Sequence, residues 1–310
     1  MFVSLFKKNK FIILFLSLFF NCLSTISLKA NPTFVDGTVV DDQGGDANTA
    51  PERFTTGLSF NNNGTKMFIT GTENASANEF TLSTAFDIST RSFVDAFDIS
   101  GTGANEDAAP TSVKFNDDGT KMFTAGFKQF IKEFSLSTAF DVSTSTFEQI
   151  KDLSTELTLN KPKDIEFNAD GTKMFILETS SIYVYTLSTA FDISTASYDN
   201  YAFSTADYET GLKAFDFSDD GKVMIILGNV DDTFHEYYLS TGFDLTTASH
   251  VSSFALAGAF FDQQPKGMAF NNTGSKMFFL GGTDTDKVFE FTLVSNYNLK
   301  LPTLSSSSPA

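Results

Sequence analysis

Carboxylates are the most plentiful side chains in this chain that could carry out chemistry. The 310 residues contain 38 Asp and Glu, 21 Lys and Arg, two histidines and one cysteine. His235 and His250 fall in segments that we expect to be strands, where a lone histidine more often packs or faces solvent than acts as a base. No nucleophile elbow, metal-binding helix, phosphate-binding loop or dinucleotide fingerprint occurs. Paired carboxylates could hydrolyse a glycosidic bond, but the sequence singles out no pair.

Five copies of one phrase determine how these acids are positioned. Each copy places a glycine inside a run that starts with Phe, has turn residues before the glycine and ends in Lys/Val-Met-Phe/Ile. The copies are Phe60–Phe68, Phe115–Phe123, Phe167–Phe175, Phe217–Ile225 and Phe270–Phe278. Their glycines lie 55, 52, 50 and 53 residues apart. A period of this length is typical of repeat architectures.

The second copy predicts how each repeat folds. Thr111–Phe115 alternates as a strand does, and a glycine-containing turn leads into a second strand over Lys121–Ala125. Gln129–Leu136 and Thr146–Leu153 supply a third and a fourth strand. Four short antiparallel strands in about 50 residues make up a propeller blade. The sequence therefore predicts an all-β fold, a five-bladed β-propeller.

A second phrase follows the third strand in four copies. It reads Leu-Ser-Thr-Ala/Gly-Phe-Asp-x-Ser/Thr-Thr and covers Leu82–Thr90, Leu136–Thr144, Leu187–Thr195 and Leu239–Thr247. Its aspartates, Asp87, Asp141, Asp192 and Asp244, could be read as ligands. An Asp followed by Ser or Thr also closes a turn through side-chain to backbone hydrogen bonds. Because equivalent residues of different blades lie far apart around the rim, we favour the turn.

The two ends of the repeat region predict a closed ring. Thr33–Asp36 resembles Ser92–Asp95, which opens the fourth strand of the first copy. The last copy stops after its third strand, Lys287–Leu293, and the second phrase is not recognisable there. Pairing the N-terminal segment with that strand would complete the fifth blade and cover two exposed sheet edges. An open arc is the alternative.

Residues outside the repeats predict export. Residues 1–30 combine four lysines with an apolar run that is short for a membrane span, as in a secretory signal cleaved near Ala30. A lipid anchor at Cys22 is the alternative. We expect signal peptide 1–30, propeller 31–298 and a Ser/Pro-rich linker or tail 299–310, in a secreted, periplasmic or cell-surface protein.

Charge narrows the classes of partner. The formal net charge is −17, so nucleic acid and anionic membrane surfaces are disfavoured as partners. Asp216–Gly221 resembles half of a calcium loop, but Leu227 stands where the bidentate Glu is needed. We therefore expect no cofactor, calcium being the one considered. The repeated third-strand acids Glu79, Glu133, Glu236 and Glu290 are expected to be solvated or to support strand pairing.

Function in repeat proteins tends to lie where the repeats differ. The most variable loops join the fourth strand to the next first strand, and the second strand to the third, and in a propeller both sets emerge on one face. The acids predicted on this face are Asp41, Asp42, Asp46, Glu106, Asp107, Asp207, Glu209, Asp231, Asp232, Asp262, Asp284 and Asp286. We expect this acidic funnel to bind a protein, a carbohydrate or a cation. Ordinary polar loop composition is the alternative.

Phe217-Ser-Asp-Asp-Gly-Lys-Val-Met resembles the Ser-Pro-Asp-Gly-Lys signature of bacterial secreted propeller repeats, of the YVTN, lactonase-like and TolB-like kinds. The likeness covers residues 34–293 and implies the fold. Lactonase members would imply catalytic His, Arg and Glu groups, and no matching motif occurs here. The sequence favours an exported, monomeric binding module without catalysis. The alternative is a carbohydrate-active hydrolase or lactonase that uses carboxylates in the central funnel.

Overall fold

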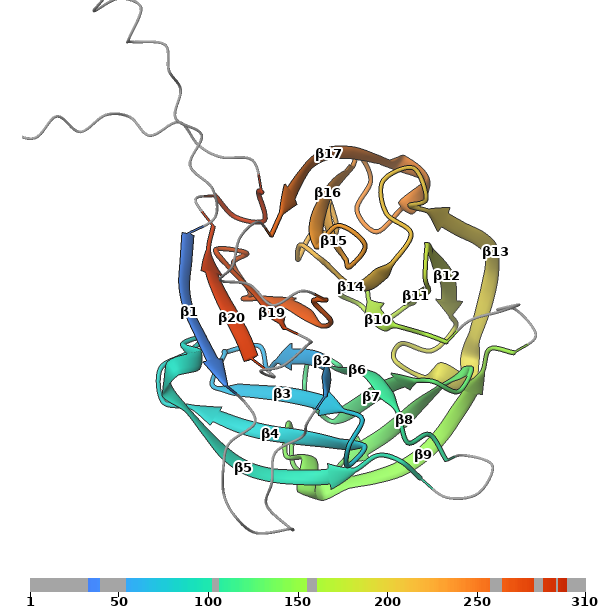
Figure 1. The fold of residues 1–310 in the computed structure, drawn as a ribbon. Coiled ribbons are helices and arrows are strands. Elements are labelled where there is room, and N and C mark those ends of the chain that lie inside the picture. The colour runs from blue at the N-terminus through green and yellow to red at the C-terminus, as the bar shows by residue number, and fades with distance from the viewer. Residues whose placement is uncertain are drawn as a thin grey trace, which may run out of the picture. The chain divides into compact units, whose positions relative to one another are not determined.

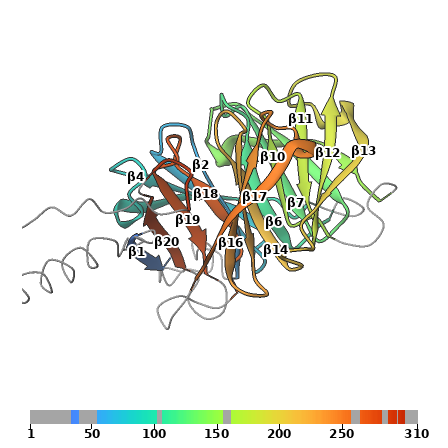
Figure 2. The ribbon, with the colours of Figure 1, turned by 90° about the horizontal axis from the view of Figure 1, so that it is seen from above.

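The computed structural model describes residues 33–39, 54–101, 106–154, 161–256, 264–281, 287–293 and 295–299, with the backbone alone for 33–39. These residues form five four-stranded antiparallel sheets arranged around a central axis (Figure 1). The predicted five-bladed propeller is therefore confirmed. Side views show the strands of each blade running between two faces of the ring (Figure 2).

The blades follow one another along the chain. Blade 1 contains β2 (Thr55–Phe60), β3 (Lys66–Gly71), β4 (Ser76–Leu82) and β5 (Arg91–Asp98). Blade 2 contains β6 (Pro110–Phe115), β7 (Lys121–Gly126), β8 (Phe130–Leu136) and β9 (Ser145–Asp152). Blade 3 contains β10 (Asp164–Phe167), β11 (Lys173–Leu177), β12 (Ser181–Leu187) and β13 (Ala196–Ser204). Blade 4 contains β14 (Leu212–Phe217), β15 (Val223–Gly228), β16 (Thr233–Leu239) and β17 (Ala248–Ala255). Blade 5 contains β18 (Met268–Phe270), β19 (Lys276–Leu280), β20 (Lys287–Thr292) and β1 (Thr33–Val39).

The fifth blade is completed by the N-terminal strand. β1 pairs antiparallel with β20, with Phe34 opposite Phe291 and Val39 opposite Lys287. Figure 1 shows the blue β1 beside the red β20. The predicted closure is thus confirmed: β1 covers the edge of β20 and completes the fifth blade as its outermost strand.

The glycine that recurs in every copy lies in the hairpin turn between the first and second strands of its blade. Gly119 adopts a φ of +71°, which glycine reaches without strain. The ring of Phe140, from the second phrase of the same blade, lies so close that a Cβ on Gly119 would be 2.2 Å from it. The first phrase thus needs its glycine for conformation and for this ring contact.

Phenylalanines of the two phrases form the joints between blades. The Phe123 ring of blade 2 lies 4.6 Å from the Phe167 ring of blade 3, and Phe167 lies 5.4 Å from Phe191. The same arrangement closes the ring, where Phe278 of blade 5 lies 4.6 Å from Phe60 of blade 1. Many of the phenylalanines in the repeats are therefore used at the joints between blades.

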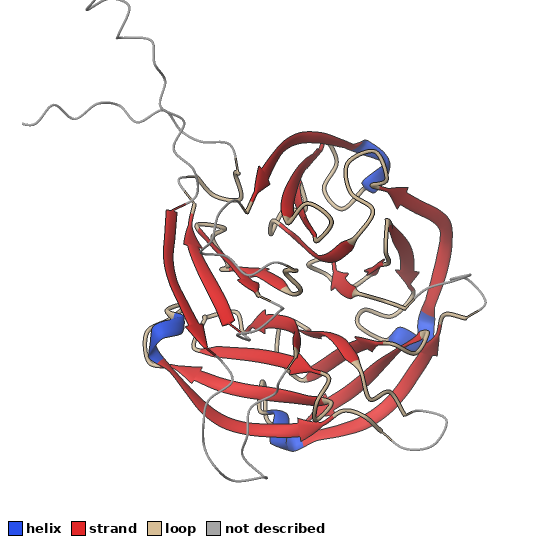
Figure 3. Ribbon diagram, viewed as in Figure 1, coloured by secondary structure: helices blue, strands red, loops and turns tan. Residues whose placement is uncertain are grey.

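The second phrase forms a short 3-10 helix at the rim, as the turn interpretation predicted. These helices are η1 (Ile88–Thr90), η3 (Val142–Thr144), η4 (Ile193–Thr195) and η5 (Leu245–Thr247), drawn in blue in Figure 3. Asp141 Oδ1 accepts from Ser143 N at 3.1 Å, and Val142 is fully buried. Asp87, Asp192 and Asp244 make the same contact, so these aspartates are turn caps.

The repeated third-strand glutamates are buried, so of the two roles expected from sequence the solvated one is wrong, while ion pairs with a lysine of the neighbouring strand agree with support of strand pairing. Glu133 is 3 % exposed; it pairs with Lys121 at 2.7 Å and accepts from Ile193 N of the next blade at 3.1 Å. Glu79 contacts blade 2 in the same way through Val142 N. Glu79, Glu133 and Glu236 therefore each accept a backbone N–H of the following copy, whereas blade 3 has Val184 at this position.

The fifth copy does contain a divergent second phrase, contrary to our sequence interpretation. Tyr297 takes the place of Phe, with a φ of +55°, and its N donates to Gly274 O at 2.8 Å. Leu299 is buried, and its N donates to Glu236 Oε2 at 3.0 Å.

The predicted domain boundaries, including the signal peptide and tail, stay predictions. Within the described ranges, no helix has the length and apolar character to cross a membrane.

Candidate functional site

The five first strands, β2, β6, β10, β14 and β18, surround the central channel (Figure 1). One mouth of the channel lies where these strands begin, beside the variable loops; we call this side the loop face. The other mouth lies at the glycine-containing turns, and we call that side the hairpin face. Each mouth has a pocket.

The predicted acids are distributed as follows. Glu106, Asp107, Asp207, Glu209, Asp231 and Asp232 lie among the described residues. Asp41, Asp42, Asp46, Asp262, Asp284 and Asp286 lie outside them.

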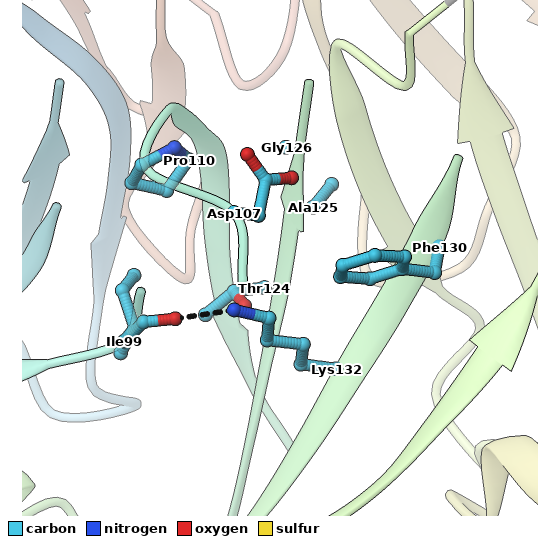
Figure 4. Close-up of a pocket in the computed structure, with 8 residues that line it drawn as sticks. All are labelled: Ile99, Asp107, Pro110, Thr124, Ala125, Gly126, Phe130 and Lys132. Carbon is cyan, nitrogen blue, oxygen red and sulfur yellow. Dashed lines mark hydrogen bonds between the residues drawn. The ribbon is translucent and has the colours of Figure 1, made fainter. Parts of the chain in front are cut away.

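Two of the predicted acids clamp loops. Asp107 is 5 % exposed, and its carboxylate accepts from Ala109 N at 3.1 Å and Lys128 N at 2.8 Å. Figure 4 shows its carboxylate beside Gly126, where a Cβ would be 2.2 Å from Asp107 Oδ2. The space around it is too small to admit a water molecule. Asp107 therefore joins two loops of blade 2 and leaves no room for a ligand beside it.

Glu209 has the corresponding role in blade 4. It is 3 % exposed, and Oε1 accepts from Thr210 N at 2.8 Å and Gly211 N at 2.6 Å. Its carboxyl group covers Gly228 as Asp107 covers Gly126. Among the remaining predicted acids that are described, Asp232 accepts from Gln264 N at 3.1 Å. Glu106, Asp207 and Asp231 are exposed.

The pocket at the loop-face mouth is lined by lysines. Its volume is about 280 Å³, and its described lining comprises Phe54, Thr56, Thr72, Thr111, Phe127, Lys163, Lys213 and Lys266. None of the predicted acids is among these lining residues. We call Lys163, Lys213 and Lys266 the lysine trio.

The lysine trio occupies one position of the repeat. Lys163, Lys213 and Lys266 each stand four residues before the first Phe of their copy, and Thr56 and Thr111 fill the same position in blades 1 and 2. The two threonines donate to the next blade, Thr56 Oγ1 to Pro110 O at 2.7 Å and Thr111 Oγ1 to Pro162 O at 2.9 Å. The mouth thus has a cationic side and an uncharged side. This recurrence was the signal in the sequence that would have found the site.

Electrostatics at this mouth lower the pKa of two lysines. Burial lowers the pKa of Lys163, and the nearby Lys161 ammonium lowers it further, against a smaller opposing effect of Glu178. Burial likewise lowers the pKa of Lys213, followed by Lys163 and Lys266, with Glu209 opposing. Phe127 partly offsets this repulsion, because Lys161 Nζ lies 4.0 Å and Lys163 Nζ 5.5 Å from its ring centroid.

Apolar side chains also gather on the loop face. Seven large apolar side chains are exposed among the described residues. Four of them lie in or next to loops of this face, namely Phe54, Phe127, Tyr208 and Val230, and the other three lie on strands β5, β9 and β16. Of these four, Phe54 and Phe127 line the pocket, and exposed apolar side chains at a pocket are typical of an interaction surface.

The opposite mouth contains a buried charge cluster, formed by Lys114 of β6, Asp164 and Glu166 of β10 and Asp216 of β14. Lys114 is ion-paired with Glu166. Asp164 accepts from Ser112 Oγ at 2.5 Å and Phe215 N at 3.1 Å. These contacts cross between blades and tie the first strands together.

Asp216 and Glu166 also line a pocket of about 430 Å³ on the hairpin face, together with Phe167 and Phe217. Burial raises the pKa of Asp216 to about 6, although Lys114 and backbone hydrogen bonds oppose the rise. Burial also raises the pKa of Glu166. Both Asp216 oxygens accept backbone N–H groups, Oδ1 from Phe217 N at 2.7 Å and Oδ2 from Phe270 N at 3.0 Å. A carboxyl with a pKa near neutrality could act as a general acid.

The two histidines lie together on the outer side of blade 4. His235 Nδ1 and His250 Nε2 are 3.0 Å and 2.9 Å from Ser253 Oγ, and Tyr208 stacks on His250 at 3.8 Å. Burial lowers the pKa of His235. In the described part of the chain, no three His, Cys, Asp or Glu side chains are grouped closely enough to hold a metal ion.

A comparison with protein-family models gave no match, and neither did one with curated proteins. Among solved structures, a protein from Lactobacillus plantarum is 12% identical with a TM-score of 0.46, over 82% of this chain and 71% of that chain. A putative 6-phosphogluconolactonase from Bacteroides uniformis is 12% identical with a TM-score of 0.46, over 79% and 69%. Another from Bacteroides fragilis is 13% identical with a TM-score of 0.47, over 79% and 68%. The chain is thus structurally similar to lactonase-like propellers at low identity, and the likeness concerns the fold alone.

Proposed function

We propose that the protein is an exported, monomeric β-propeller that acts as a binding module, with its ligand at the loop-face mouth. The observation that carries the proposal is the pocket of about 280 Å³, whose lining includes two exposed large apolar side chains, Phe54 and Phe127. Small-molecule sites in proteins are concave and mostly apolar, with a few polar groups that fix orientation. We also propose that the protein is one of the secreted bacterial propeller repeat proteins.

The absence of catalysis at this mouth is supported by its lining. The described lining residues offer Thr hydroxyls and Lys ammonium groups, and none is a carboxylate or a histidine. General acid–base catalysis most often uses those groups. The site is therefore better suited to holding a ligand than to transforming one.

A matched pair of variants tests the proposal. Phe127 on the loop face is 44 % exposed, and Phe147 on β9 is 43 % exposed. The purified protein is screened against soluble polysaccharides, peptides and small molecules, and each hit is titrated against Phe127→Ser and Phe147→Ser. We expect Phe127→Ser to weaken the hits at least about fivefold, since one buried ring contributes more than 1 kcal/mol, and Phe147→Ser to leave them unchanged. Hits that respond equally to both variants would exclude the loop face.

A hydrolase or lactonase is the second candidate, favoured by Asp216 and Glu166 beside aromatic rings at the hairpin-face pocket. Its test is turnover of aryl glycosides and of simple lactones by the purified protein, with Asp216→Asn and Glu166→Gln as the variants expected to abolish it. Turnover that survives both substitutions, or none by the parent protein, would eliminate this candidate. The hydrogen bonds that occupy both Asp216 oxygens favour the binding module over it.

A further inference from the structure

We infer that the lysine trio binds the negatively charged group of a small organic anion, whose flat or apolar body lies against Phe127 and Phe54. The inference rests on the proposed binding function of the loop face and specifies its ligand class. Carboxylate, phosphate and sulfate groups share the required chemistry.

The first argument is that the fold does not require lysine at this repeat position. Blades 1 and 2 close around the same mouth with Thr56 and Thr111, which are held by hydrogen bonds to the next blade. Lysine side chains carry large rotamer entropy and repel one another when gathered. Three lysines at equivalent positions of consecutive blades are therefore explained by a ligand rather than by folding.

The second argument is charge. The chain has a formal net charge of −17, yet the described lining of this pocket contains three cations and no anion. Lys161 adds a fourth ammonium close to Phe127. Because burial and mutual repulsion disfavour the charged forms of Lys163 and Lys213, an anion placed among them would relieve both effects.

The third argument is the shape of the pocket. Its volume of about 280 Å³ is near the lower limit for small-molecule sites. The cations come from blades 3, 4 and 5, while Phe54 and Phe127 come from blades 1 and 2. A ligand with one charged end and one apolar end matches this division. Lysine acts as a point charge on a flexible stem, so the site accepts an anion without demanding one planar geometry.

Titration calorimetry with phenyl phosphate, benzoate and uncharged benzyl alcohol tests the inference at fixed pH and ionic strength. We expect either anion to bind at least tenfold more tightly than benzyl alcohol. Phenyl phosphate binding more tightly than benzoate would identify a phosphate-type group, and the reverse order a carboxylate. Equal affinity for the anions and the alcohol would overturn the inference.

Charge variants locate the binding site. Lys213→Gln removes one member of the lysine trio, and Lys222→Gln removes the same charge from an exposed position on the hairpin face. We expect Lys213→Gln to weaken the tighter anion about tenfold, as loss of one charge-assisted contact does, and Lys222→Gln to change it less than twofold. Unchanged unfolding temperatures confirm that both variants fold. Equal effects of the two substitutions would overturn the inference.

The outcome also separates this inference from the proposed function. If neutral ligands bind and depend on Phe127 while Lys213→Gln has no effect, the ligand class is wrong and the binding function stands. If ligands of every charge bind without dependence on Phe127, the proposed function itself fails.

Discussion

Asp216 gives a sharp prediction about stability and pH. Burial beside the channel raises its pKa to about 6, from the 3.8 that is ordinary for an aspartate. A carboxyl whose pKa is raised in the folded state binds its proton more tightly there than in the unfolded chain. Its contribution to stability is therefore full below the unfolded pKa and is lost as pH rises through about 6.

The magnitude follows from the shift. A difference of about two pKa units corresponds to about 3 kcal/mol in total, of which about 2 kcal/mol is lost between pH 4.5 and 7.5. Asp118 and similar exposed aspartates, whose pKa is lowered by hydrogen bonds to Thr120 or its equivalents, titrate below this window. His235 acts in the opposite direction within it, because burial lowers its pKa. The quantity to compare is therefore the difference between the parent protein and Asp216→Asn.

Urea unfolding at a series of pH values measures this difference. We expect Asp216→Asn to gain about 2 kcal/mol relative to the parent protein as pH rises from 4.5 to 7.5. Asp118→Asn, which removes an exposed carboxylate that titrates below this window, should show no such trend. A constant difference between the parent protein and Asp216→Asn across the window would refute the assignment of a raised pKa to this carboxyl.

Three further predictions concern the stability and closure of the propeller. Gly119→Ala should cost about 2–5 kcal/mol in urea unfolding, because its φ is positive and its Cβ would meet the Phe140 ring; the effect should be less than additive with Phe140→Ala. Glu133→Gln should cost about 1–3 kcal/mol, since it loses a charge-assisted contact to the next blade, whereas the exposed Glu148→Gln should cost under about 0.5 kcal/mol. Deleting residues 31–40 should expose the β20 edge and cause self-association visible by light scattering; a protein that remains monomeric would contradict the closing role of β1.

The architecture could be predicted because its determinants are local and repeated. A positive φ at Gly119, the ring of Phe140 and the cap at Asp141 all lie within one blade, so the sequence displays the glycine in five copies and the Phe-Asp pair in four, at fixed spacing. The closing strand was identifiable because Thr33–Asp36 resembles the start of the fourth strand of blade 1, and blade 5 needed a fourth strand. The second phrase of the fifth copy was not recognised in the sequence. Tyr297 replaces the Phe there and makes the same ring contact with Gly274.

The repeat pattern did not predict which charged side chains are buried. Glu133 looks like an ordinary exposed acid of a strand, and its partners lie across a hairpin and in the next blade. Asp107 and Glu209 sit in variable loops, which is why they were selected, yet both Asp107 oxygens and Glu209 Oε1 accept backbone N–H groups. Variability between repeats marks loops, whether they bind a ligand or only close over the end of a strand.

The lysine trio escaped for the opposite reason. Each lysine is about 50 residues from the next, so no short motif contains two of them. A single lysine in an acidic chain does not by itself indicate a binding site. Only the ring brings Lys163, Lys213 and Lys266 to one mouth. In a propeller, equivalent residues on the outer strands are dispersed around the rim, whereas equivalent residues at the start of the first strands converge on the axis. Position within the blade therefore decides whether a repeated residue type is structural or can form a site. By that criterion the start of the first strand is the position of this repeat where a change of residue type most directly changes what the protein can bind.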